Sequence, residues 1–215
     1  MTASPNPVAD AFLESLARAQ SVAAPFQHWL LAGALPEEDV AAIEALPFAP
    51  PVAAVFDGKR ESNNSVRVFF NRENQERFEV CRRVAEGFND ARVRRAIVEA
   101  TGADLSGGHL RIEYCQDVEG FWLAPHTDIS VKTFTMLLYL SDDPRLAHAG
   151  TDLHEGPPDF TYAGSAPYGR NLGLIFVPAK NTWHAIGKKP LHGAVRKSII
   201  VNYVTSAWRE TSELS

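Results

Sequence analysis

The sequence has few cysteines, no long apolar run and no excess of basic residues. Cys81 and Cys115 are its only cysteines, so it carries no disulfide framework, and we interpret both as free thiols. No stretch reaches the roughly 18 apolar residues that a membrane-spanning helix needs, which predicts no membrane span. The formal net charge of −5 predicts no electrostatic affinity for nucleic acid or for an anionic membrane surface.

The N-terminus lacks the pattern of a secretory signal, because residues 1–10 contain no basic stretch followed by an apolar one. We therefore expect a cytoplasmic protein. A length of 215 residues with 45% hydrophobic content is typical of one globular domain, which we expect to span residues 1–215. No feature of the sequence predicts an oligomeric state.

The first part of the chain, residues 1–105, is predicted to be mainly helical with one or two strands. Apolar spacing, proline and acidic start signals indicate helices over residues 8–24, 36–46, 73–88 and 90–101. Short strands are expected over residues 26–31 and 65–70.

The second part, residues 106–215, consists of short β-rich segments separated by Gly, Pro, Asp and Asn. Strands are predicted over residues 109–115, 120–128, 131–140, 150–154, 172–177, 182–188 and 195–204. This pattern favours a sandwich or a jelly roll, and the preceding helices favour an α+β class in which helices buttress one sheet. Residues 155–170 lack periodicity and predict a loop that either covers a substrate or packs on the sheet.

A candidate metal site begins with His126-Thr-Asp128. Residues two apart on a strand share a face, so this imidazole and carboxylate can point into one cavity. His184, in a later strand pattern, would complete a set of two histidines and one carboxylate, which suits iron(II) because coordination positions stay open. His192 is the alternative third ligand, and a pair of side chains satisfied within a turn is the alternative for the His-x-Asp pair.

An anion site is predicted at Arg196-Lys-Ser198, which lies in an apolar strand pattern. A buried guanidinium is costly unless it meets an anion, and its planar fork binds a carboxylate through two hydrogen bonds. Ser198 lies two residues on, so its hydroxyl shares the face of Arg196. A ligand that bears a carboxylate would satisfy both side chains.

These motifs, in this order, resemble the iron(II)/2-oxoglutarate-dependent oxygenase superfamily and, within it, the prolyl-hydroxylase-like branch. The resemblance covers about residues 109–204. Its motifs are Arg111-Ile-Glu-Tyr114, His126-Thr-Asp128, Leu138-Tyr-Leu-Ser141, Gly150-Thr-Asp-Leu153, His184 and Arg196-Lys-Ser198. Where the branch often has a tryptophan six residues after the arginine, this chain has Asn202, whose role the resemblance leaves open.

The resemblance implies a double-stranded β-helix, the cupin-like jelly roll, and a role for each matching residue. His126, Asp128 and His184 would bind iron(II). Arg196 would pair with the distal carboxylate of 2-oxoglutarate, with Ser198 or Tyr139 donating beside it. Tyr114 would line the co-substrate pocket, and Leu153 would supply an apolar wall.

The implied activity is that of a dioxygenase, an oxidoreductase that uses O2 and 2-oxoglutarate to hydroxylate a C–H bond and releases succinate and CO2. Ascorbate would support turnover. The alternatives are a cupin-like metal-binding or sensing protein without oxygenase activity, and a cupin-type metal enzyme, which usually has more histidines close to the first. The sequence does not identify the substrate: a protein side chain, free amino acid, peptide-bound intermediate or saccharide fits equally.

Overall fold

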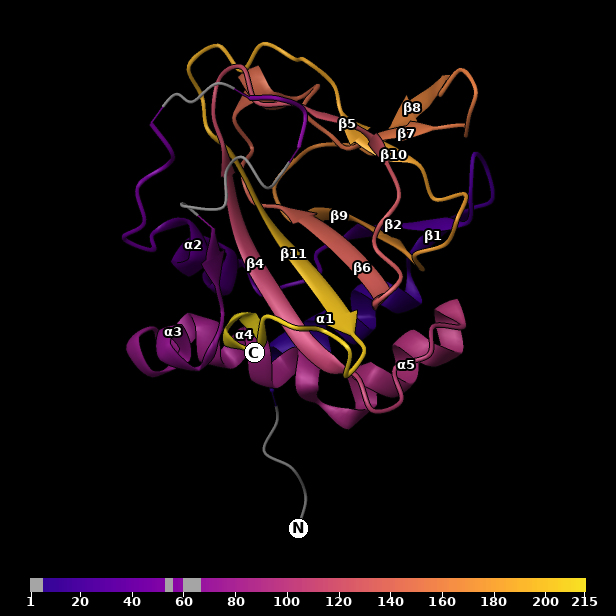
Figure 1. The fold of residues 1–215 in the computed structure, drawn as a ribbon. Coiled ribbons are helices and arrows are strands. Elements are labelled where there is room, and N and C mark those ends of the chain that lie inside the picture. The colour runs from indigo at the N-terminus through magenta and orange to yellow at the C-terminus, as the bar shows by residue number, and fades with distance from the viewer. Residues whose placement is uncertain (1–5, 53–55, 60–66) are drawn as a thin grey trace.

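The computed structural model describes residues 6–52, 56–59 and 67–215, which combine helices with two antiparallel sheets (Figure 1). This agrees with the predicted mixture of helices and strands. The helices of the described residues are α1 (Pro7–Ala17), α2 (Glu37–Glu44), α3 (Arg72–Arg77), α4 (Glu79–Asn89) and α5 (Ala91–Thr101). None of these helices is both long and apolar enough to cross a membrane.

Two predicted helices differ from the observed ones. The helix predicted over 8–24 ends at Ala17, because the following residues form strand β1 (Gln20–Val22), which pairs with β2 (His28–Ala32). Strand pairing therefore overrides the apolar spacing there. The helix predicted over 73–88 is divided into α3 and α4 at Phe78, whose backbone is extended. The ring of Phe78 packs edge-on against Phe48 at 5.5 Å between centroids.

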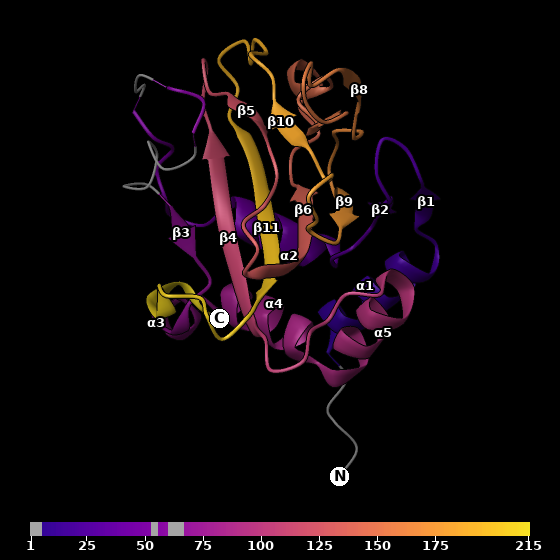
Figure 2. The same cartoon turned by 45° about the vertical axis from the view of Figure 1, so that its right-hand side comes forward.

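The larger sheet has the strand order β1-β2-β9-β6-β11-β4-β3 within the described residues (Figure 2). Besides β1 and β2, it contains β3 (Val68–Phe69), β4 (His109–Asp117), β6 (Lys132–Tyr139), β9 (Leu172–Phe176) and β11 (Arg196–Val204). In the strand predicted over 65–70, Ser65 and Val66 lie outside the described residues. Strand β1 was not predicted.

The smaller sheet has the order β5-β10-β7-β8 within the described residues. Its strands are β5 (Leu123–His126), β7 (Asp152–His154), β8 (Tyr162–Ser165) and β10 (His184–Ile186). Strand β8 lies inside the segment 155–170 that was predicted to be a loop. It pairs with β7, so the hydrogen-bonding partner rather than local periodicity makes this segment a strand.

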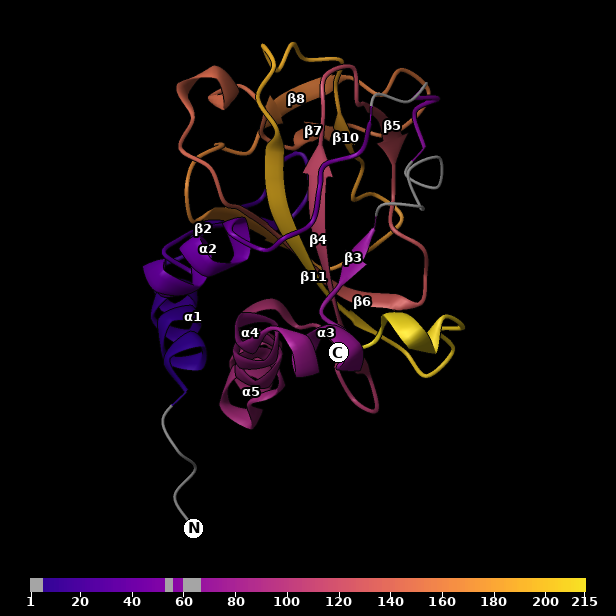
Figure 3. The same cartoon turned by 90° about the vertical axis from the view of Figure 1, so that its left-hand side faces the viewer.

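The larger sheet uses its two faces differently. On β11, Ile199, Val201 and Tyr203 pack into an apolar cluster that also contains Phe12 of α1 and Phe88 of α4. The helices that supply this cluster therefore lie on this face, and Figure 3 shows α4 and α5 below β4 and β11. The alternate residues of β11 face away from the helices, toward the smaller sheet. Functional side chains are consequently expected on this second face.

Candidate metal and co-substrate site

A cavity of about 430 Å³ lies between the two sheets. His126 and His184 line it from the smaller sheet, and Thr135, Leu137 and Ile200 line it from the larger one. Asp128 also lines it. The structure therefore brings together the three residues predicted as iron ligands, although they lie up to 58 positions apart in the sequence.

The two histidines sit opposite each other on neighbouring strands. His184 of β10 is the register partner of His126 of β5, and their ring centroids are 4.3 Å apart. His126 Nδ1 lies 2.8 Å from the Ala124 carbonyl oxygen, and His184 Nδ1 lies 2.9 Å from that of Thr182. A carbonyl only accepts, so each Nδ1 carries a hydrogen, and Nε2 is the nitrogen through which each neutral imidazole could bind a metal. This arrangement orients a histidine as a metal ligand.

Asp128 lies two residues beyond the end of β5, so it is not on the strand as predicted, yet it reaches the cavity. Its side chain is 7% exposed. Lys132 Nζ donates to Oδ1 at 2.6 Å, and Thr135 Oγ1 donates to Oδ2 at 2.6 Å. Burial acts to raise the pKa of this carboxyl, but the charge of Lys132 and these hydrogen bonds outweigh it and hold the pKa well below its usual value.

The protonation states of Asp128 and His184 suit a divalent metal. Asp128 is an anion, and burial lowers the pKa of His184 to about 4, so its imidazole is neutral near pH 7. As the side chains lie, however, no three His, Cys, Asp or Glu side chains of the described residues gather tightly enough to hold a metal ion. Asp128 instead forms an ion pair with Lys132. The donor set, two imidazoles and one carboxylate, is of the kind that iron(II) takes.

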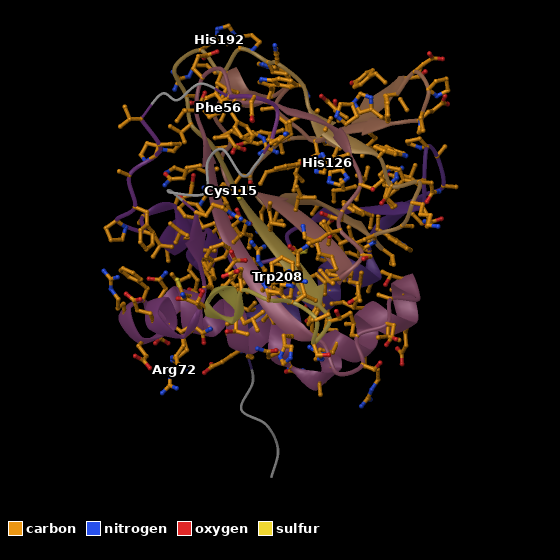
Figure 4. All side chains as sticks on the ribbon, in the orientation of Figure 1. Phe56, Arg72, Cys115, His126, His192 and Trp208 are labelled. Carbon is orange, nitrogen blue, oxygen red and sulfur yellow. The ribbon has the colours of Figure 1, made fainter. Side chains whose placement is uncertain are left out.

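Thr135 and Asn202 fix the orientation of Asp128, and neither was predicted to do so. Asn202 Nδ2 donates to Thr135 Oγ1 at 2.9 Å, so the hydroxyl hydrogen of Thr135 is directed at Asp128 Oδ2. Asn202 Oδ1 accepts from Arg111 Nη1 at 3.4 Å. Arg111 is itself held by Glu213 and lies over the rings of Phe69 and Trp208. The last of these rings is labelled in Figure 4.

Arg196 lies at the start of β11, 1% exposed, and its anionic partner belongs to the protein. Its Nη1 donates to Asp117 Oδ2 at 2.7 Å, and its Nε donates to the Ala149 carbonyl oxygen at 2.7 Å. Asp117 is the register partner of Arg196 on β4. The prediction that this guanidinium meets an anion is therefore satisfied internally. Both residues line a small second cavity beside Leu191.

Two buried hydroxyl groups lie on the same side of the fold as Arg196. Ser198 Oγ is buried and has no hydrogen-bond partner among the described residues, and the buried Tyr168 hydroxyl oxygen accepts from the backbone of Lys197. The guanidinium lies 5.3 Å from the Tyr139 ring centroid and 5.9 Å from that of Tyr168. Tyr139 is the register partner of Ser198, but its hydroxyl already donates to Thr151 Oγ1 at 2.9 Å. The hydroxyl groups of Ser198 and Tyr168 can both still donate their hydrogens to a polar ligand.

Tyr114 does not lie where the resemblance implied. It packs on the helix-facing side of β4 with Ile112, while its neighbour Glu113 lines the cavity. The prediction for Tyr114 is wrong because residues 111, 113, 115 and 117 of β4 face the smaller sheet, and alternation turns Tyr114 away. Leu153 is the register partner of His184 and joins the apolar cluster that also contains Tyr139 and Ile200.

The remaining histidines lie apart from the cavity-lining set. His192 is exposed at a positive φ of 52°, at the top of the molecule and away from His126 (Figure 4). His154 Nδ1 lies 2.7 Å from the Phe160 carbonyl oxygen. The ring of Phe160 in turn packs against the partly buried Trp183 at 4.8 Å between centroids, so Trp183 contacts the 155–170 segment.

The fold is shared with solved structures of oxygenases. A prolyl-4-hydroxylase from Pseudomonas putida is 15% identical with a TM-score of 0.58, and the match covers 93% of this chain and all of that one. An oxidoreductase of the 2OG-Fe(II) oxygenase family from Burkholderia pseudomallei is 14% identical with a TM-score of 0.54, covering 100% and 98%. The α-ketoglutarate-dependent epimerase SnoN of nogalamycin biosynthesis is 15% identical with a TM-score of 0.54, covering 94% and 86%.

These similarities confirm the predicted resemblance to this superfamily and to prolyl-hydroxylase-like structures at the level of fold. No family model and no curated protein matches the sequence.

Proposed function

We propose that the protein is an iron(II)- and 2-oxoglutarate-dependent oxygenase that hydroxylates a C–H bond. The observation that carries the proposal is the convergence of His126, Asp128 and His184 on one cavity, with the Nδ1 atoms of both histidines fixed by backbone carbonyls. The shared fold of the oxygenase structures supports it. We interpret the two sheets with the cavity between them as the double-stranded β-helix core.

The two histidines and Asp128 would hold iron(II), which together with 2-oxoglutarate and O2 supplies the oxidation and yields succinate and CO2. Thr135 and Asn202 keep one oxygen of Asp128 engaged and present the other to the cavity. Leu137 and Ile200 line the cavity with apolar surface and limit the access of water. The buried hydroxyls of Ser198 and Tyr168 would donate to the distal carboxylate of the co-substrate beside Arg196.

A second function is favoured by the ion pair of Arg196 with Asp117. A metal-binding or sensing protein with no oxygenase activity needs no carboxylate site, and in this structure the carboxylate at Arg196 comes from the chain itself. Such a protein would bind a divalent metal through the same two histidines but would not bind 2-oxoglutarate.

The test is formation of succinate from 2-oxoglutarate with iron(II), ascorbate and O2. We expect the wild-type protein to form succinate, at least slowly without its substrate, and expect Asp128→Ala and Arg196→Ala to form none. Each variant is first checked by its melting temperature, so that loss of folding is not read as loss of function. If wild type binds metal but neither binds nor consumes 2-oxoglutarate, the oxygenase proposal fails and the metal-binding function is favoured.

A further inference from the structure

Each oxygen of the Asp128 carboxylate accepts one hydrogen bond. Oδ2 accepts the hydrogen of Thr135 Oγ1, and that hydroxyl cannot turn away without losing the bond that it accepts from Asn202. Oδ1 is the remaining oxygen, and it is held by Lys132 Nζ at 2.6 Å. A metal ion that binds Oδ1 would replace Lys132 there, while Thr135 keeps its hydrogen bond to Oδ2.

The ammonium group of Lys132 and a divalent cation repel each other strongly in a buried site, since little water screens them. The Lys132 side chain is 17% exposed and lines the cavity, so it has room to turn away from Asp128 and still face the cavity. Metal binding would thus replace one cation by another at Asp128 and release the ammonium group.

A released Lys132 would find no unpaired carboxylate in the described lining of the cavity. Besides Asp128, the acidic residue of that lining is Glu113. Its two oxygens accept from Arg67 Nε and Nη2 at 2.8 Å each, and Arg111 Nη2 adds a third bond at 3.0 Å. The cationic residues in the described lining are Lys59, Arg67, Arg111 and Lys132.

We propose that Lys132 is an anion-binding residue of the metal-loaded cavity and that it selects an oxidisable substrate with a carboxylate group. Lys132 holds Asp128 while the site lacks metal, and holds the substrate carboxylate once metal is bound. This carboxylate is distinct from the distal carboxylate of 2-oxoglutarate, which is assigned to Arg196 in the second, small cavity. Oxidation of this substrate rests on the proposed function. The displacement of Lys132 by a metal ion and its binding of a carboxylate do not depend on it.

The first step is tested with Mn(II) alone, by calorimetry on metal-free protein. Lys132→Met removes the competing ammonium group, so Mn(II) is expected to bind at least about tenfold more tightly than in wild type, which corresponds to 1.4 kcal/mol. The metal-free variant should melt lower than wild type and gain more from Mn(II), because Asp128 loses its counter-ion. Equal or weaker Mn(II) binding by a folded Lys132→Met overturns the proposal. Lys132→Gln, which keeps a donor for Asp128, carries the same test if Lys132→Met does not fold.

The second step compares hexanoate with hexanamide, two ligands that differ in the carboxylate. Both are titrated into protein saturated with Mn(II) and 2-oxoglutarate, and binding near the metal is read from the Mn(II)-induced broadening of their proton NMR signals. Wild type and Lys132→Arg are expected to bind hexanoate at least about tenfold more tightly than hexanamide, and Lys132→Met to bind them equally.

Lys188→Met is the matched control, because it removes the same charge from an exposed position over Trp122, outside the described lining of the cavity. It should keep the preference for hexanoate. Equal binding of the two ligands by wild type, or a preference that persists in Lys132→Met, overturns the proposal. If 2-oxoglutarate itself does not bind, the proposed function fails, and the comparison on protein loaded with Mn(II) alone still decides the role of Lys132.

Discussion

Replacing Asp117 by asparagine separates the charge of the buried pair at Arg196 from its hydrogen bond. The asparagine oxygen can still accept from Arg196 Nη1, and the bond from Nε to the Ala149 carbonyl oxygen is unaffected. Only the negative charge is lost. We therefore expect Asp117→Asn to bind 2-oxoglutarate more tightly than wild type, because the distal carboxylate of 2-oxoglutarate no longer shares the Arg196 guanidinium with the Asp117 carboxylate.

The magnitude follows from the burial of the pair, since Arg196 and Asp117 are 2% and 3% exposed. Two carboxylates about 4 Å apart repel by about 4 kcal/mol at an effective dielectric constant of 20. Side-chain relaxation reduces this value, so we expect a tightening of roughly tenfold to a hundredfold. Without ligand, the variant should lose about 1 to 3 kcal/mol of stability, because the guanidinium keeps a hydrogen bond but loses its counter-ion.

The assay is calorimetric titration of 2-oxoglutarate into Mn(II)-loaded protein, with urea denaturation of the same samples to measure stability. Arg196→Met is the companion variant and should lose 2-oxoglutarate binding. If Asp117→Asn binds 2-oxoglutarate no better than wild type while remaining folded, the charge of Arg196 is not what binds the distal carboxylate, and the assignment of this residue is refuted.

Further predictions concern the metal ligands, the orientation of Asp128 and the cysteines. His184→Ala should abolish Mn(II) binding in calorimetry while His192→Ala leaves it unchanged, because His192 is exposed outside the cavity lining; the opposite result would exchange the two assignments. Asn202→Leu should weaken Mn(II) binding about tenfold, since Thr135 Oγ1 is then free to turn from Asp128; unchanged affinity in a folded variant would contradict this. Burial raises the pKa of Cys81 to about 12, so the native thiol stays protonated and should resist iodoacetamide at pH 8, with labelling rising only as the pH approaches 12. Mass spectrometry measures this labelling against protein unfolded in guanidinium, and equally fast labelling of the native Cys81 would refute its burial.

Much of the β-rich part was predictable, because turn residues bound each strand and side chains alternate within it. Strands β4, β6, β9 and β11 lie within about two residues of their predicted limits. The convergence of His126 and His184 was also predictable. Each lies in a strand pattern, and the order of the motifs along the chain resembles that of the oxygenase superfamily. Strand β8 was not predictable, because its pairing with β7 depends on tertiary contacts rather than on local composition.

The partners of the site residues could not be read from the sequence. The pair of Arg196 with Asp117 depends on the register between β4 and β11, which are separated by about 80 residues. The ion pair between Lys132 and Asp128 depends on the turn that follows β5. Asp128 lies in this turn and not on the strand. The face of Tyr114, by contrast, was open to prediction, because the polar residues Arg111, Glu113 and Asp117 alternate along β4 and indicate its cavity side.

In the proposed function, His126, Asp128 and His184 bind a metal ion, which in turn binds 2-oxoglutarate. Calorimetric titration of 2-oxoglutarate into metal-free and Mn(II)-loaded protein tests it most directly, with His184→Ala as the variant that lacks a ligand. We expect 2-oxoglutarate to bind the Mn(II)-loaded wild type, to bind the metal-free protein at least about tenfold more weakly, and not to bind His184→Ala with Mn(II) present. Equal binding with and without Mn(II), or no binding to the Mn(II)-loaded wild type, would contradict the proposed function.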